Sequence, residues 1–278
     1  MSSSPAGHVA RSTVRPNAET GSRTPLRTFL TAADGISIDS VYEPGGVVYD
    51  ASAPSTGHPV FVVAHGFTGD VDRPHVRRVA SALARHGTVV TFSFRGHGRS
   101  GGHSTVGDRE VHDLAAVVEW ARSLGHARVA TVGFSMGGSV VLRHAALHPG
   151  TVDAVVSVSA PARWYYRGTP PMRRVHWLVT RPEGRLVARY GFRTRIHGDW
   201  DPVPLSPVEA VPKIAPTPLL IVHGDQDGYF PLDHPRMLAE AAAGHGELWV
   251  EHGMGHAEHA ADDGLLARIG DWAVAQGG

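Results

Sequence analysis

Short, unbroken apolar runs recur along the chain, and the segments between them have helical periodicity. The runs are residues 60–64, 88–92, 129–132, 154–158, 218–222 and 247–250. Runs of β-branched residues without alternation are typical of strands that are covered on both faces, as in a parallel sheet. Residues 35–42 instead alternate apolar and polar positions, which predicts a half-buried strand.

The segments between these strands predict helices. They are residues 74–86, 108–124 and 135–148, with a further helix after each of the last two strands. Residues 105–108 provide a plausible N-terminal cap for the second helix. Strands that alternate with helices predict an α/β fold with a doubly wound, mostly parallel sheet and right-handed crossovers.

One segment, residues 161–207, interrupts this alternation and is too long to be a simple loop. It contains nine Arg, three acidic residues and seven aromatic residues. An insertion between strands is expected over their carboxyl ends, where open α/β folds bind ligands, so we predict a lid. Its candidate substrate-binding residues are Trp164, Tyr165 and Trp177.

The lid composition has two interpretations. The aromatic residues could line an acyl pocket while the arginines attract an anionic substrate. Alternatively, the aromatic residues pack the lid onto the body and the arginines form a solvated face, and we place this interpretation first.

Length and composition indicate one soluble domain, residues 26–278, preceded by a disordered tail over residues 1–25. The formal net charge of zero gives no indication of a nucleic-acid partner or a membrane surface. The chain has no Cys, which excludes disulfide, thiolate and zinc–sulfur chemistry. No apolar stretch approaches the roughly 20 residues that span a bilayer, and the polar N-terminus does not resemble a secretory signal. We therefore expect a cytoplasmic protein.

The sequence Gly133-Phe134-Ser135-Met136-Gly137 lies between a predicted strand and a predicted helix. A sharp strand-to-helix turn pushes its serine into the open, and the positive end of the helix dipole favours an anion beside the hydroxyl. A glycine-rich turn with an incidental serine is the alternative. The strand–turn–helix context favours Ser135 as a nucleophile.

A serine hydroxyl needs a general base, and the base needs an orienting acid. The expected order along the chain is serine, acid and histidine. The strand at 218–222 is followed by His223-Gly224-Asp225-Gln226-Asp227-Gly228-Tyr229-Phe230-Pro231. The strand at 247–250 is followed by Glu251-His252-Gly253-Met254-Gly255-His256.

From about Val60 to the C-terminus, apart from the lid, the chain resembles the α/β-hydrolase fold superfamily, specifically the compact bacterial serine hydrolases and esterases. In that family the motif His-Gly-x-x-Asp-x-x-hydrophobic-Pro carries the acid of the catalytic triad, which implies Asp227. The motif Gly-x-Gly-His carries the base, which implies His256.

The resemblance also implies an oxyanion hole. The family's His-Gly pair after the third strand matches His65-Gly66, so the backbone N–H of Phe67 would be one donor and that of Met136 the other. The Gly-His-Gly-x-Ser sequence at residues 96–100 matches a structural turn beside the family's site.

Other residues compete for these roles. Asp225 competes with Asp227, although the spacing to Pro231 favours Asp227, and His252 competes with His256. His65 and His223 are expected to build loops. The spacing of His252, His256 and His259 could suggest a metal site, but Gly253 and Gly255 interrupt any helix through it, so we expect no metal and no cofactor.

These residues predict a serine hydrolase that cleaves a carboxylic ester, thioester or amide through an acyl-enzyme. The same triad could instead serve C–C bond hydrolysis, perhydrolysis or acyl transfer, and a non-catalytic binding protein is a further alternative. The expected partner is a small-molecule acyl substrate, with no nucleic acid and no membrane span. The oligomeric state is not predicted.

Overall fold

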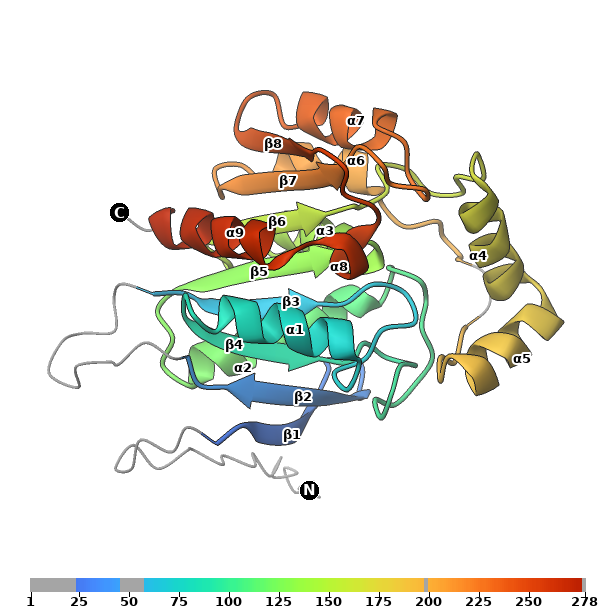
Figure 1. The fold of residues 1–278 in the computed structure, drawn as a ribbon. Helices are drawn as coiled ribbons and strands as arrows, with labels where there is room; N and C mark the ends of the chain where they lie inside the picture. Colours follow the sequence, from blue (N-terminus) through green and yellow to red (C-terminus); the bar gives the residue numbers. More distant parts are fainter. Residues whose placement is uncertain (1–23, 46–57, 198–199, 277–278) are drawn as a thin grey trace, which may run out of the picture.

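A computed structural model describes residues 24–45, 58–197 and 200–276, and shows an eight-stranded sheet between two layers of helices (Figure 1). The strands are β1 (Leu26–Thr31), β2 (Ser37–Glu43), β3 (Val60–Ala64), β4 (Thr88–Phe92), β5 (Val129–Phe134), β6 (Ala154–Val158), β7 (Leu219–Gly224) and β8 (Gly246–Glu251). Their order across the sheet is β1-β2-β4-β3-β5-β6-β7-β8. Strands β3 to β8 pair in parallel, and β2 pairs antiparallel with both of its neighbours.

The helices follow the strands as the periodicity predicts. They are α1 (Pro74–Leu83), α2 (Glu110–Ser123), α3 (Met136–Leu147), α4 (Pro170–Thr180), α5 (Pro182–Gly191), α6 (Pro207–Ala210), α7 (Asp233–Ala241), α8 (Ala257–Ala260) and α9 (Asp263–Ala275), with a 3₁₀ turn at Val211–Lys213. The predicted α/β class with a mostly parallel sheet is confirmed. Every residue of β3 to β7 is buried, as expected for strands that are covered on both faces.

Each face of the sheet has its own hydrophobic core. Phe61, Val63 and Leu220 point to the face that α1 and α9 cover, where they pack with Leu83 and Leu266. The residues between them in sequence point to the opposite face. Val60, Val62 and Leu219 pack there with Leu114 of α2 and Val140 of α3. The alternation of side chains along buried strands therefore produces two cores from uninterrupted apolar runs.

The order of the strands fixes where a ligand can bind. Strand β3 lies between β4 and β5, so the chain turns to opposite sides of the sheet after β3 and after β5. At such a switch point the loops that follow the two strands separate and leave a crevice at their carboxyl ends. The loop after β3 and the turn after β5 border this crevice.

The structure departs from the sequence predictions near the N-terminus and at α2. Strand β1 was not predicted; it pairs antiparallel with β2, and its partly exposed residues give no clear hydrophobic pattern. Helix α2 begins at Glu110, two residues later than expected, and the Thr105 hydroxyl accepts a hydrogen bond from the N–H of Arg109 instead of capping the helix itself. Nearly all of the predicted tail, and most of the segment between β2 and β3, lie outside the described residues.

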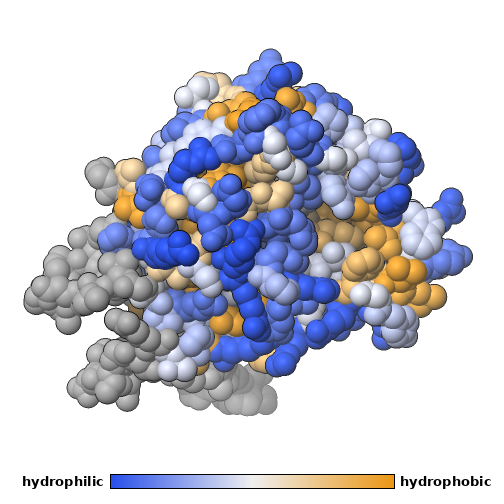
Figure 2. All heavy atoms as spheres, viewed as in Figure 1, coloured by the Kyte–Doolittle hydropathy of each residue, from blue (hydrophilic) through white to orange (hydrophobic). Residues whose placement is uncertain are grey.

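The predicted insertion, residues 161–207, contains α4 and α5, which stand beyond the carboxyl ends of the strands (Figure 1). Hydrophobic side chains gather on this side of the molecule (Figure 2). The large apolar side chains exposed in the insertion are Tyr165, Trp177, Leu186, Val187, Tyr190, Phe192 and Val203. Within the described ranges, no helix is both long and apolar enough to cross a membrane.

Candidate active site

Ser135 lies in the tight turn between β5 and α3 and has φ 51° and ψ −113°, a left-handed backbone conformation that is costly for a residue with a side chain. Two glycines make the turn possible. A Cβ on Gly133 would lie 2.2 Å from the carbonyl oxygen of Gly137, and a Cβ on Gly137 would lie 2.2 Å from the carbonyl oxygen of Ala64. The glycines of the pentapeptide are therefore required by close backbone approach.

Ser135, His256 and Asp227 form a continuous hydrogen-bonded chain. The Ser135 Oγ lies 2.9 Å from His256 Nε2, and His256 Nδ1 lies 2.8 Å from Asp227 Oδ2. The three residues come from the turn after β5, the loop after β8 and the loop after β7. The structure thus brings the three predicted catalytic residues together in the geometry of a serine nucleophile, a base and an orienting acid.

The loop after β7 holds the carboxylate of Asp227 in place. Its Oδ1 accepts hydrogen bonds from the backbone N–H groups of Tyr229 and Phe230, at 2.8 and 3.1 Å. Burial alone would raise the pKa of Asp227, but the hydrogen bond and charge of His256, with the Phe230 N–H, lower the pKa below its usual value. Asp227 therefore stays ionised beside the imidazole, as an orienting acid must.

The two competing residues pair with each other, away from Ser135. Asp225 Oδ2 lies 2.8 Å from His252 Nδ1, and Asp225 Oδ1 accepts a hydrogen bond from the Gly253 N–H at 2.7 Å. The His252 side chain is 97% exposed. Asp225 and His252 therefore tie the loops after β7 and β8 together at the surface.

The loop after β3 presents the backbone N–H of Phe67. The Gly66 carbonyl accepts hydrogen bonds from His65 Nδ1 at 2.7 Å and from the Gly69 N–H at 3.0 Å. The Gly66 carbonyl and the Phe67 N–H belong to the same planar trans peptide group and point in opposite directions. Because the carbonyl is held by its two donors, the Phe67 N–H points away from them. Within the described chain, neither the Phe67 N–H nor the N–H of Met136, the first residue of α3, donates to a protein acceptor.

Buried histidines support this loop. His65 Nε2 accepts a hydrogen bond from the Phe94 N–H, and His97 Nε2 accepts one from the Thr68 N–H. Burial lowers the pKa of His65 to about 3 and that of His97 to about 4. Both imidazoles are therefore neutral, with the proton on Nδ1, and they build loops as predicted for His65.

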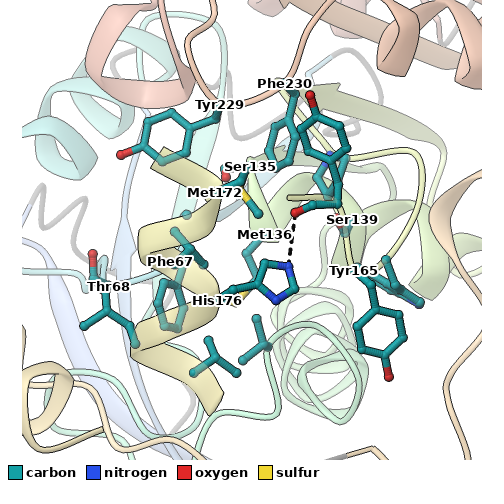
Figure 3. A pocket seen from close by; sticks show the side chains of 18 of the residues that line it. Phe67, Thr68, Ser135, Met136, Ser139, Tyr165, Met172, His176, Tyr229 and Phe230 are labelled. Atoms are coloured by element: carbon teal, nitrogen blue, oxygen red, sulfur yellow. Dashed lines mark hydrogen bonds between the residues drawn. The ribbon is translucent and has the colours of Figure 1, made fainter. Parts of the chain in front are cut away.

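A cavity of about 420 Å³ opens over Ser135. Figure 3 shows Phe67 and Ser135 of the body and Met172 and His176 of α4 around this one space. Most of the other side chains lining it are apolar or aromatic: Val106, Trp164, Tyr165, Tyr166, Val175, Leu178, Val179, Phe192, Trp200, Tyr229 and Phe230. The cavity has the size and the apolar character of a small-molecule site.

The candidate residues of the insertion differ in position. Trp164 and Tyr165 line the cavity, and Trp164 Nε1 donates a hydrogen bond to the Pro204 carbonyl at 2.9 Å. Trp177 does not line it, and 44% of its surface is exposed. Arg173 and Arg174 also lie outside the lining, while the arginine that does line it, Arg163, is paired with Asp233 at 3.0 Å.

Several residues of the site were not predicted from the sequence. Tyr229 stacks on the imidazole of His256 with ring centroids 4.1 Å apart, and Glu258 lines the cavity. Met172, Val175 and Val179 of α4 also line it, and their spacing of three and four residues is a signal of one helical face that could have been used. Among the described residues, no group of three or more His, Asp or Glu side chains could hold a metal ion.

A nucleophile on a strand-to-helix turn of a doubly wound sheet, with acid and base on later loops, defines the α/β-hydrolase type of enzyme. The family profile described as alpha/beta hydrolase fold matches residues 59–172. A monoacylglycerol lipase of Mycolicibacterium smegmatis is 31% identical over 241 residues, which cover 72% of this chain and 82% of that protein. The chain therefore belongs to the alpha/beta hydrolase fold family, and it is an esterase- or lipase-like serine hydrolase.

Solved structures show the same fold. An esterase of Pyrococcus furiosus, Pf2001, has a TM-score of 0.69 at 22% identity, with 90% of this chain and 92% of that chain covered. Est1E of Butyrivibrio proteoclasticus, solved with ferulic acid bound, has a TM-score of 0.57 at 20% identity, with 89% of this chain and 97% of that chain covered. At these identities the likeness concerns the fold alone.

Proposed function

We propose that this protein hydrolyses carboxylic esters with a small or medium-sized apolar acyl group, through an acyl-enzyme on Ser135. The observation that carries the proposal is the hydrogen-bonded chain from Asp227 through His256 to Ser135 at the floor of the apolar cavity. The name of the lipase relative and the apolar lining support an ester with an apolar acyl group.

In the first step His256 Nε2 accepts the proton of the Ser135 hydroxyl as Oγ attacks the substrate carbonyl. The carbonyl oxygen becomes an oxyanion, which the N–H groups of Phe67 and Met136 stabilise. Loss of one such donor typically costs about 3 kcal/mol in the transition state. Asp227 stabilises the imidazolium, and His256 then protonates the leaving alcohol as the C–O bond breaks.

In the second step His256 accepts a proton from water, and the hydroxide oxygen attacks the acyl-enzyme. The second tetrahedral intermediate forms in the same oxyanion hole. It collapses to the free acid, and the proton returns from His256 to Ser135 Oγ. Neither step requires a cofactor.

The cavity would receive the acyl group of the substrate. The Nε1 atoms of Trp164 and Trp200 both donate to backbone carbonyls, so these two side chains present apolar rings to the cavity. Arg173 and Arg174 lie outside the lining, so the cavity walls favour an apolar acyl group over an anionic one.

The test is hydrolysis of p-nitrophenyl esters from acetate to palmitate by the wild type and by Ser135→Ala. We expect activity that peaks at one chain length and falls by at least about a thousandfold in the variant. No hydrolysis of any ester, together with covalent labelling of Ser135 by a fluorophosphonate, would contradict ester hydrolysis and favour thioester, amide or C–C bond cleavage, perhydrolysis or acyl transfer. No hydrolysis and no labelling would favour a non-catalytic binding protein.

A further inference from the structure

Glu258 is the single carboxylate among the described residues that line the cavity. It lies in the short helix α8, two residues after His256, and only 3% of its surface is exposed. A buried carboxylate in a largely apolar cavity is costly unless hydrogen-bond donors reach it. Its partners therefore indicate what it does.

One oxygen of this carboxylate is occupied by the loop that follows β3. Oε1 of Glu258 accepts a hydrogen bond from the Gly66 N–H at 2.9 Å. The absence of a side chain on Gly66 leaves room for this approach, because a Cβ there would lie in tight contact with the two carboxylate oxygens, at 3.0 and 3.1 Å. The same Cβ would lie 3.4 Å from Ser135 Cβ, so Glu258 is close to the reacting group.

The other oxygen, Oε2, accepts no hydrogen bond from the part of the chain that the structure describes. Among the side chains that the structure describes, the nearest basic one is His75, whose Nε2 lies 4.0 Å from Oε1, beyond hydrogen-bond distance. Burial and the adjacent His259 lower the pKa of His75, which disfavours a charged imidazole beside the carboxylate. Arg78 donates to the backbone carbonyl of Glu258 and not to its carboxylate.

The position of Glu258 relative to His256 indicates which part of the substrate it faces. His256 must protonate the leaving oxygen, so the alcohol portion of an ester lies on the His256 side of the carbonyl carbon. Glu258 and His259 line the cavity directly after His256 in the chain. The acyl group would then lie against the apolar cavity walls that the body and α4 form, away from Glu258.

We propose that Glu258 selects esters whose alcohol portion carries a free hydroxyl group close to the ester oxygen, such as monoesters of diols and polyols. The substrate hydroxyl donates a hydrogen bond to Oε2 and supplies the donor that the protein does not provide. Oε1 meanwhile keeps its bond to Gly66. This inference rests on the proposed ester hydrolysis and specifies the alcohol.

The test compares 2-hydroxyethyl butyrate with propyl butyrate, which replaces the hydroxyl by a methyl group and keeps the acyl chain. Hydrolysis is followed by titration of the released acid. A hydrogen bond to a charged acceptor gives a preference of about tenfold or more in kcat/KM, so we expect the wild type to favour the hydroxyethyl ester by that factor.

Glu258→Gln keeps an oxygen for the Gly66 N–H and places an NH2 group at Oε2, which cannot accept the substrate hydroxyl. We expect the ratio of the two kcat/KM values to fall to about two or less. Glu119→Gln, on the exposed surface of α2, is the matched control and should keep the wild-type ratio.

Equal kcat/KM values for the two esters in the wild type would overturn this inference and leave the proposed function intact. An unchanged ratio in Glu258→Gln would overturn it as well. Failure of the wild type to cleave either ester would remove the proposed ester hydrolysis and this inference with it. The ratio of the two kcat/KM values in the wild type tests this inference even if Glu258→Gln does not fold.

Discussion

The proposed catalytic residues of this protein are positioned mainly by backbone groups. Peptide N–H groups fix Asp227, and backbone donors and buried imidazoles hold the loop that carries Phe67. Ser135 occupies its strained conformation because two glycines let three backbone segments approach closely. Asp225 also accepts a backbone hydrogen bond and lies 2.8 Å from His252, but His252 is exposed at the surface, which is why a short Asp–His distance alone does not identify a catalytic pair.

Asp227 and Asp225 provide a matched comparison at the residue scale. We expect Asp227→Asn to reduce kcat on p-nitrophenyl butyrate by about 10³- to 10⁴-fold, because the amide no longer stabilises the imidazolium or the correct tautomer. The kcat of Asp225→Asn on the same ester should stay within about twofold of the wild-type value. If steady-state kinetics showed a larger loss of kcat in Asp225→Asn than in Asp227→Asn, the assignment of the acid would be reversed.

Residue types and their spacing predicted Ser135, Asp227 and His256 as a triad. The structure places Ser135 and Asp227 each within hydrogen-bond distance of His256. Glu258 could not be proposed in this way. Its role depends on contact between α8 and the loop after β3, which are 192 residues apart in the chain and share no motif. The stacking of Tyr229 on His256 could not be predicted from the motif that contains Tyr229, because it is a property of the folded loops.

Among the helices and strands, α4 is the element through which the insertion contacts the site. The break in the alternation of strands and helices located the insertion, and its expected position beyond the strand ends agrees with Figure 1. Composition did not show which face of α4 turns inward. Met172, Val175 and Val179 line the cavity and Trp177 is exposed, so the smaller side chains contact the site.

A larger side chain on the inner face of α4 should shorten the acyl pocket. We expect Val179→Trp to reduce kcat/KM for p-nitrophenyl decanoate relative to acetate by about tenfold, because the added ring fills cavity volume that a long chain needs. Val187→Trp makes the same change on α5 at an exposed position outside the lining and should leave the ratio unchanged. Equal ratios in both variants and the wild type would show that α4 does not bound the acyl pocket.

At the scale of the whole molecule, the order of strands brings the loops after β3 and β5 to one crevice. The uninterrupted apolar runs predicted this parallel arrangement because each strand had to be covered on both faces. Strand β1 could not be predicted in the same way, since it lies at the edge of the sheet and its residues are only partly buried. Edge strands carry the weakest hydrophobic signal, whereas the central strands determine the position of the site.

The buried histidines make the stability of the fold depend on pH. Burial lowers the pKa values of His65 and His144 to about 3 and those of His97 and His234 to about 4. Below the usual pKa near 6.5 the unfolded chain binds protons that the folded protein does not, so the free energy of unfolding falls as pH drops from 6.5 towards 4. Each histidine contributes a loss that approaches about 1.4 kcal/mol per pH unit once the pH lies well below 6.5.

His144 allows this effect to be isolated, because it lies buried in α3 and its Nδ1 has no hydrogen-bond partner within the described chain. We expect the free energy of unfolding of His144→Leu to fall by about 1 kcal/mol less than that of the wild type between pH 6.5 and 5.5, as measured by urea denaturation, because the unfolded imidazole is already half protonated at pH 6.5. In His252→Leu, at an exposed position, the change in the free energy of unfolding should be closer to that of the wild type than it is in His144→Leu. Identical losses in His144→Leu and the wild type would contradict the depressed pKa of His144.

Covalent labelling tests whether Ser135 is a nucleophile that His256 activates. The protein is treated with a fluorophosphonate, and the modified peptide is identified by mass spectrometry together with the rate of labelling. We predict a single adduct on Ser135, no adduct in Ser135→Ala, and labelling at least about a hundredfold slower in His256→Ala, while His252→Ala labels at the wild-type rate. An adduct on another residue, or equal rates in His256→Ala and the wild type, would contradict the account.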